Sequence, residues 1–128
     1  MKHTITIEIP NSDNIRIELD DSYCPDAVSA FLKHLPFTLK ANLWGDEIYT
    51  DSAPFSTQEE NSKSVVELFD VAFWPPGKAI CLFYGPTPIS EKNQIKPYSP
   101  VNIIGKIMAP DKTILSKIQD GTNLTFRA

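Results

Sequence analysis

Strict alternation of apolar and polar residues at the start of the chain constrains its fold more than any other feature. Two apolar sets follow this rule on either side of a polar turn at residues 10–13: Ile5, Ile7, Ile9 and Ile15, Ile17, Leu19. Successive side chains of a strand point to opposite faces, so a period of two is typical of a half-buried β-strand. The first twenty residues therefore predict a β-hairpin with one face in a core.

The apolar period then changes to that of a helix. Four apolar residues follow the spacing i, i+3, i+4 and i+7, which places them on one helical stripe: Val28, Phe31, Leu32 and Leu35. Pro25 suits the first helical position, and Pro36 cannot continue a helix because it lacks an N–H donor. We expect a helix from Pro25 to about Leu35 that plugs one end of the core.

The remainder of the chain predicts further short strands separated by turns. An alternating strand is expected at 37–44, with Phe37, Leu39, Ala41 and Leu43 inward, followed by a break at Gly45 and extended structure at 47–49. A surface excursion at 51–64 then leads to one bent strand or a strand pair at 65–74 and to a strand buried on both faces at 79–84. The last expected elements are a polar loop at 90–100, a strand at 101–107, a short helix after Asp111 and a strand at Leu124 and Phe126. Seven or eight strands and two short helices in one domain, residues 1–128, are typical of a closed barrel or a sandwich, and periodicity alone leaves both open.

Composition excludes several classes of function. The net charge is −4 and the chain has two arginines, Arg16 and Arg127, so we expect neither nucleic acid nor an anionic membrane as a partner. No signal peptide or membrane-spanning run is visible, and two cysteines are too few for a disulfide framework, so a reducing cytoplasm is the expected location. No cofactor or metal is expected, because no glycine-rich phosphate loop and no zinc-ligand spacing around His3 or His34 is present.

The titratable groups give weak signals. Asp46 and Glu47 are adjacent, and neighbouring strand positions point to opposite faces, so this pair predicts a solvated turn rather than a shared acid–base site. Cys81 lies in a continuous apolar run and predicts an inert core thiol. Cys24 precedes Pro25 at a helix start and is expected to be structural, because no histidine is placed by a motif to activate it.

Three stretches, read together, resemble the atypical cyclophilin-like proteins of prokaryotes. They are Trp44–Tyr49, Ala72–Ser90 and Pro100–Ile107, and their order and spacing match along almost the whole chain. The resemblance implies a closed eight-stranded barrel with a short helix capping each end. One departure is local: the family often has glycine before the aspartate that precedes the second stretch, and Phe69 stands there, which predicts an altered bulge.

The same resemblance bears on activity. Ordinary cyclophilins donate a hydrogen bond to the prolyl nitrogen from an arginine on the barrel face, which lowers the amide barrier of about 18–20 kcal/mol. No arginine occurs between residues 37 and 84, so the catalytic residues are unknown and efficient prolyl isomerisation is not expected. A lysine lacks the planar donor fork of arginine.

A candidate binding rim surrounds the two proline-rich turns of the second stretch. Its candidate ligand-binding residues are Trp74, Lys78, Thr87, Trp44 and Glu47. The alternative is that these turns only close the barrel. The leading hypothesis is a module that binds a small molecule or a proline-containing peptide; a degenerate prolyl isomerase and a self-associating interaction protein are the alternatives. A monomer or a weak homodimer is expected.

Overall fold

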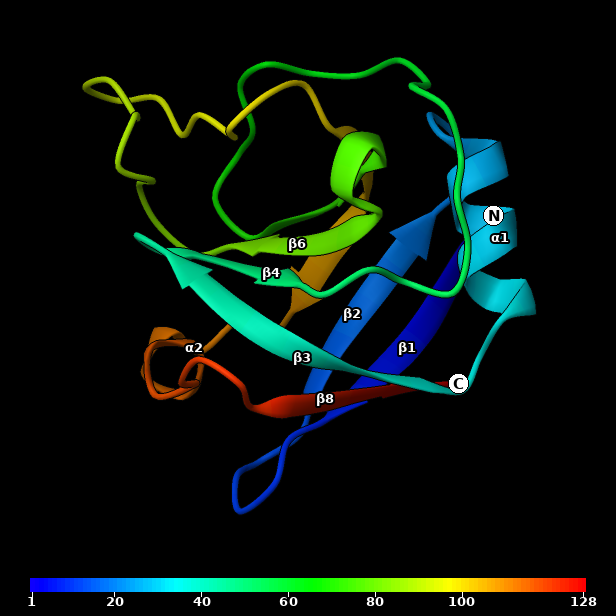
Figure 1. The fold of residues 1–128 in the computed structure, drawn as a ribbon, viewed down its shortest axis with the longest axis horizontal. Helices are drawn as coiled ribbons and strands as arrows, with labels where there is room; N and C mark the ends of the chain where they lie inside the picture. The colour runs from blue at the N-terminus through cyan, green and yellow to red at the C-terminus, as the bar shows by residue number, and fades with distance from the viewer.

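The computed structural model describes residues 1–128 as eight antiparallel strands, two α-helices and one 3-10 turn (Figure 1). The strands are β1 (Lys2–Glu8), β2 (Ile15–Asp20), β3 (Phe37–Trp44), β4 (Glu47–Thr50), β5 (Asp70–Trp74), β6 (Ala79–Phe83), β7 (Asn102–Met108) and β8 (Asn123–Arg127); the helices are α1 (Pro25–Lys33) and α2 (Lys112–Ser116), and the 3-10 turn is η1 (Pro75–Gly77). No helix is long and apolar enough to cross a membrane.

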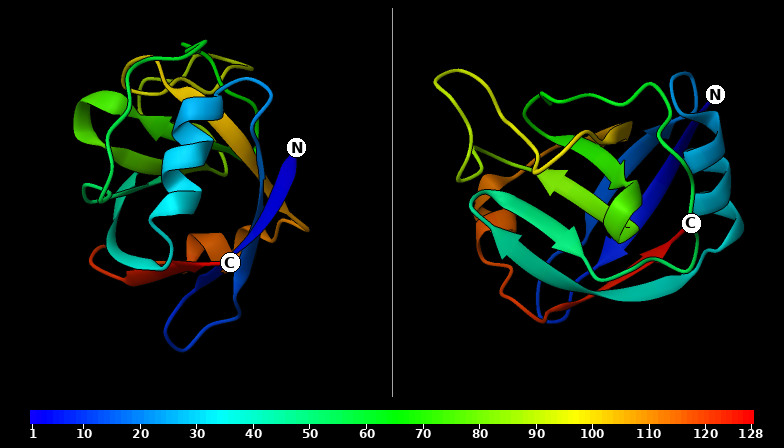
Figure 2. Two further views of the ribbon diagram at one scale, coloured as in Figure 1. Left: turned by 90° about the vertical axis from the view of Figure 1, so that its right-hand side faces the viewer. Right: turned by 45° about the horizontal axis from the view of Figure 1, so that its top comes forward.

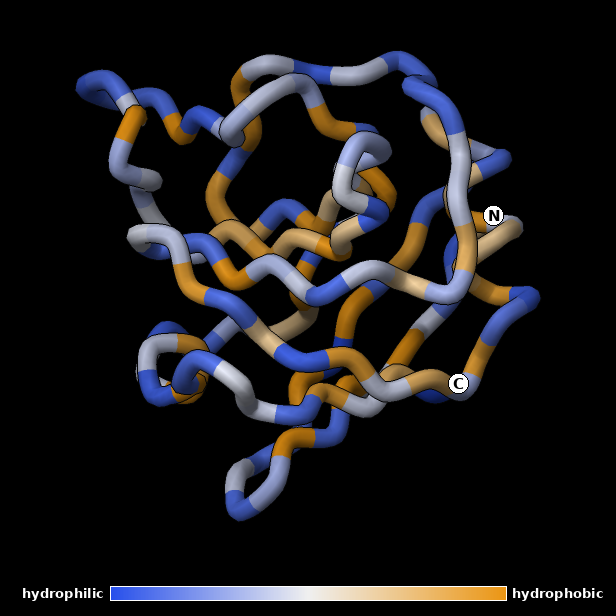
Figure 3. Tube along the Cα trace, in the orientation of Figure 1, coloured by the Kyte–Doolittle hydropathy of each residue, from blue (hydrophilic) through white to orange (hydrophobic).

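The strands form a closed barrel in the order β1-β2-β7-β5-β6-β4-β3-β8, which answers the choice between barrel and sandwich. In the first hairpin Ile5 pairs with Ile17 and Ile7 with Ile15, and all four side chains are buried, as the alternation predicts. The same alternation is visible along β3 and β8 (Figure 3). Closure pairs every strand on both sides, so no long edge is left exposed.

The two helices lie at opposite ends of the barrel (Figure 2). Helix α1 buries Val28 and Phe31 against the core, as predicted, and it ends at Lys33, two residues before the expected end. Its N-terminal N–H groups of Asp26 and Ala27 donate to the carboxylate of Glu60, at 3.0 and 3.1 Å. The loop between β4 and β5 is therefore fastened to the helix.

Two sequence predictions are wrong in part. Leu43 is not in the core, because β3 ends at the next residue and 36% of Leu43 is exposed. Of the strand expected at 65–74, only β5 forms: the carboxylate of Asp70 accepts from the N–H of Glu67 at 2.8 Å, which turns the chain before the strand. Phe69 lies within this turn at φ +69°, a left-handed conformation that glycine adopts more readily.

Strand β6 is buried on both faces, as its continuous apolar sequence predicts. Ile80 and Leu82 belong to the barrel core, while Cys81 and Phe83 belong to a second, outer cluster with Val66 and others. The two long connections, which precede β5 and follow β6, cover this outer face (Figures 1 and 2). They are bridged to each other at Lys63–Val101 and Val66–Ile95. This covered outer face holds the candidate site.

Candidate functional site

Four neighbouring strands, β3, β4, β6 and β5, place side chains on the outer face of the barrel. Trp44 at the end of β3 pairs with Glu47 at the start of β4 across a two-residue turn. Tyr49 has the same strand phase as Glu47 and pairs with Cys81 of β6. Ile48, with the opposite phase, is fully buried in the barrel core. The alternation that builds the core therefore also gathers the outward side chains into one place.

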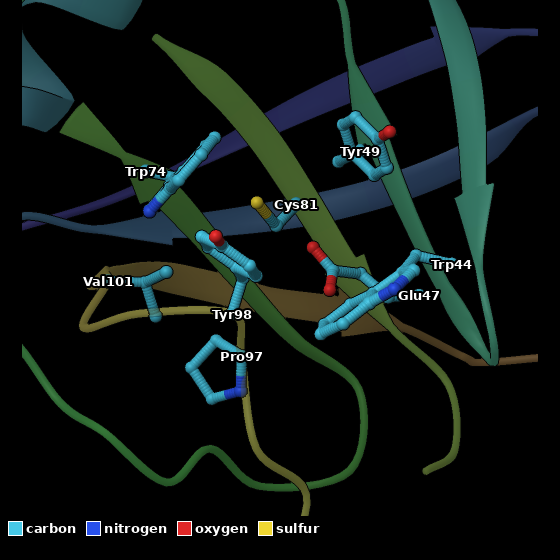
Figure 4. A pocket seen from close by; sticks show the side chains of 8 residues that line it. All are labelled: Trp44, Glu47, Tyr49, Trp74, Cys81, Pro97, Tyr98 and Val101. Carbon is cyan, nitrogen blue, oxygen red and sulfur yellow. The ribbon is translucent and has the colours of Figure 1, made fainter. Parts of the chain in front are cut away.

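These outward side chains line a pocket with a volume of about 200 Å³ (Figure 4). The loop that follows β6 forms its other side. The lining residues are Trp44, Glu47, Tyr49, Trp74, Cys81, Pro97, Tyr98 and Val101. Both tryptophans of the chain are among them. Half of the lining side chains are thus aromatic, and one carries a carboxyl group.

Tyr98 lies against both indoles. Its ring centroid is 6.0 Å from Trp44 and 5.8 Å from Trp74, with interplanar angles of 71° and 84°, so both contacts are edge-to-face. The indole N–H of Trp74 donates to the hydroxyl of Ser99 at 2.6 Å, which fixes the loop beside the pocket. Tyr98 itself is 72% exposed, so it forms the solvent side of the pocket.

Glu47 is the one acidic side chain in the pocket, and it is only 5% exposed. Its carboxylate points into the group of lining side chains, between Trp44 and Cys81 (Figure 4). No ion pair forms there, because no lysine, arginine or histidine lines the pocket. Burial raises the pKa of Glu47 to about 7, and the nearby Cys81 thiol offsets part of that rise.

Cys81 forms part of the pocket wall beside Glu47. Burial and the Glu47 carboxyl raise the pKa of its thiol well above the ordinary value. Cys24 is also buried; its thiol donates to the Glu60 carbonyl, and burial raises its pKa to about 11. Since the thiolate is the nucleophile, neither cysteine is activated for catalysis, in agreement with the sequence.

The structure brings together three of the five candidate rim residues, namely Trp44, Glu47 and Trp74. Lys78 lies outside the pocket, exposed at the end of η1 with φ +53°. Thr87 is buried in the turn after β6, where its hydroxyl donates to the Lys96 carbonyl. Its role is therefore to hold the loop that carries Tyr98.

The predicted solvated turn at Asp46 and Glu47 is wrong for Glu47. The turn itself consists of Gly45 and Asp46, and Gly45 takes φ +59°. Glu47 already belongs to β4, and the neighbouring aromatic side chains and the loop that carries Tyr98 cover it. Asp46 is half-buried and does not line the pocket.

Five lining residues were not among the sequence candidates: Tyr49, Cys81, Pro97, Tyr98 and Val101. Tyr49 carried a usable signal, because it shares its strand face with Glu47. No sequence pattern indicates that Tyr98 and Pro97 line the pocket, since they belong to an irregular loop whose path depends on tertiary contacts.

The two arginines lie away from this pocket. Arg16 of β2 and Arg127 of β8 line a separate hollow beside α2, and Arg127 pairs with Glu8 at 3.3 Å. The pocket therefore contains no guanidinium donor. No three acidic, histidine or cysteine side chains lie close enough together to hold a metal ion.

Comparisons with known proteins agree with this fold. A family model described as cyclophilin-like matches residues 3–127. The chain is also similar to a hypothetical protein from Archaeoglobus fulgidus with a solution structure: sequence identity is 41%, the TM-score is 0.81, and the match covers 98% of this chain and 94% of the archaeal one. No functionally curated protein matches the sequence.

Proposed function

The chain belongs to the cyclophilin-like family, and on that premise we propose that it is a binding module whose aromatic pocket takes a small molecule or a short peptide segment. The observation that carries this proposal is the pocket of about 200 Å³ in which both tryptophans, two tyrosines and one buried carboxyl meet. Ligand pockets are characteristically concave and apolar, with a few polar groups that fix orientation.

The preformed walls support binding. Trp74 is held by its bond to Ser99, and the loop that carries Tyr98 is held by the bonds of Thr87 and Ser90. Side chains that are already ordered lose little entropy when a ligand arrives, which favours affinity in a small site.

We further propose that the protein does not accelerate prolyl isomerisation efficiently. A hydrogen-bond donor to the prolyl nitrogen is needed beside the bound proline, and the pocket contains no arginine or lysine. Exchange NMR on a short Xaa-Pro peptide tests this: no added line broadening is expected at substoichiometric protein. Strong broadening that disappears in a variant of one pocket residue would overturn it.

A ligand screen tests the binding role directly. Because both tryptophans line the pocket, intrinsic fluorescence reports occupancy without a label. We expect hits from a library of metabolites and short peptides to bind Tyr98→Ala at least tenfold more weakly than the parent protein. Tyr23→Ala is the matched control, since Tyr23 is also an exposed tyrosine and lies outside the pocket.

Two outcomes would contradict the proposal. If every hit bound Tyr98→Ala, Trp74→Phe and the parent equally well, the ligand site would lie elsewhere. If the protein formed a stable dimer in solution that Tyr98→Ala dissociated, the pocket would be a self-association surface instead.

Lys78→Ala is expected to change neither binding nor stability by more than about 0.5 kcal/mol, as is usual for an exposed position outside a site.

A further inference from the structure

The carboxyl group of Glu47 lacks a partner of opposite charge. It is 95% buried and forms no ion pair, and the one hydrogen-bond donor of the chain beside it is the weakly donating thiol of Cys81. Several other carboxylates of the chain do have such a partner: Asp70 pairs with Lys106, Glu91 with Lys96 and Asp21 with the N-terminus. Burying an ionised carboxylate is costly unless a positive group or several donors accompany it. The chain supplies neither to Glu47.

The aromatic rings around Glu47 attract positively charged groups, as its carboxylate does. Trp44 and Tyr49 flank it on neighbouring strand positions, and Tyr98 links Trp44 to Trp74 through its two edge-to-face contacts. The faces of such rings carry partial negative charge and attract cations held within about 6 Å of the ring centre. A buried carboxyl group and several aromatic rings around one cavity therefore favour the same kind of ligand group.

We propose that this pocket binds a small organic ammonium group, with its charged head against the Glu47 carboxylate and its alkyl substituents against the rings of Trp44, Trp74 and Tyr98. The proposal rests on the proposed function, in that it names the ligand class for the same pocket. It identifies the missing partner of Glu47 as the ligand itself.

The size and chemistry of the pocket restrict the kinds of cation that it can bind. A dry cavity of about 150 Å³ holds benzene, so about 200 Å³ accommodates an alkylated ammonium head but not a folded partner. Ca²⁺ is disfavoured, because it takes about six to eight oxygen ligands and the pocket offers one carboxylate. An ammonium group with apolar substituents is satisfied by one carboxylate and the ring faces.

The proposal makes the affinity depend on pH with a defined sign. A cation favours the ionised carboxylate, and only the ionised fraction of Glu47 is competent to bind it. With a pKa of about 7, that fraction grows about tenfold between pH 6 and pH 8, so affinity for the cation rises by about the same factor. The titratable groups that face Glu47 are Cys81, Tyr49 and Tyr98; both histidines lie outside the pocket.

A pair of probes of equal shape tests the inference. Choline carries a quaternary nitrogen, and 3,3-dimethylbutan-1-ol has a carbon atom in its place and no charge. Both are titrated into the parent protein by tryptophan fluorescence and by calorimetry at pH 6 and pH 8 in low salt. We expect choline to bind at least tenfold more tightly than the alcohol at pH 8, and to lose about tenfold in affinity at pH 6.

Two variants locate the effect. Glu47→Gln keeps the side-chain shape and removes the charge, so choline affinity is expected to fall at least tenfold at pH 8 and to become independent of pH, and the preference for choline over the alcohol is expected to be lost. Glu59→Gln is the matched control, because Glu59 is exposed and forms no ion pair or side-chain hydrogen bond. Its choline affinity is expected to equal that of the parent.

Each contrary result has a separate meaning. Equal binding of choline and the alcohol, tighter binding at pH 6 than at pH 8, or no choline binding up to about 10 mM would overturn the ammonium assignment. The pocket would remain a binding site if library ligands still bound the parent protein more tightly than Tyr98→Ala. If those ligands were also insensitive to Tyr98→Ala, the proposed function itself would fail.

Discussion

Replacement of Glu47 by glutamine is expected to stabilise the free protein at pH 8. The folded state raises the pKa of this carboxyl from 4.5 to about 7 because burial disfavours the charge. Between these two pH values the folded protein retains a proton that the unfolded chain releases. Stability from this group is therefore present below about pH 4.5, decreases as the pH rises, and is fully lost above about pH 7.

The magnitude follows from the size of the pKa change. At about 1.4 kcal/mol for each pH unit, a rise from 4.5 to about 7 corresponds to about 3 kcal/mol of lost stability at pH 8. At pH 5 only a small part of this loss has occurred, and the stability lost there is about 1 kcal/mol. Glutamine has no proton to release, so its stability does not change with pH through this group. The stability advantage of Glu47→Gln over the parent is therefore expected to be about 2 kcal/mol larger at pH 8 than at pH 5.

Urea denaturation followed by tryptophan fluorescence measures this difference. The free energy of unfolding is determined for the parent, for Glu47→Gln and for Glu59→Gln at both pH values and without ligand. The exposed Glu59→Gln control is expected to differ from the parent by no more than about 0.5 kcal/mol at either pH. If Glu47→Gln changed the free energy of unfolding by the same amount at pH 5 and pH 8, folding would not raise the pKa of Glu47. That result would refute the reasoning.

Two further predictions concern the barrel. Phe31→Ala is expected to cost about 3–5 kcal/mol, because the fully buried ring of Phe31 packs edge-on against Phe37 and Phe126; an unchanged melting temperature would exclude this placement. Gly105→Ala is expected to cost about 1–3 kcal/mol, since its added Cβ would clash with the Glu18 carbonyl oxygen of the paired strand; a variant as stable as the parent in urea would show that β2 and β7 are not so closely paired.

Local patterns in the sequence are sufficient to predict most of the barrel. The alternation in β1 and β2 specifies a hairpin whose apolar face must be covered, and the stripe of Val28 and Phe31 supplies a cover at one end. These signals depend on residues that are near in sequence. The choice between barrel and sandwich depends on pairing between distant strands, such as β1 with β8, and here the family resemblance was needed.

The predictions that were wrong concern positions where distant contacts override the local pattern. Leu43 follows the inward phase and pairs with the buried Ile48, yet it lies one residue from the end of β3 and is 36% exposed. Val65 and Leu68 are apolar like strand residues, but the bond between Asp70 and the Glu67 N–H turns the chain there. In each case a side chain or a strand end, rather than residue propensity, decides the outcome.

The candidate site could be predicted only in part. Trp44 and Trp74 were found because large aromatic residues stand out in short strands. The burial of Glu47 was missed because a loop about fifty residues later covers it, and sequence position gives no sign of that cover. An isolated glutamate beside a turn is ordinarily solvated, so its burial is the observation that distinguishes this pocket.

The central claim, that the pocket around Glu47 is the binding site, is tested most directly by NMR of the two tryptophan indole groups. Both belong to pocket residues, and no other indole exists in the chain. When a ligand from the screen is titrated, the indole N–H signals of Trp44 and Trp74 are expected to shift together and saturate with one dissociation constant, equal to that from calorimetry. Saturable shifts at Arg16 and Arg127 with both indole signals unmoved would contradict the claim.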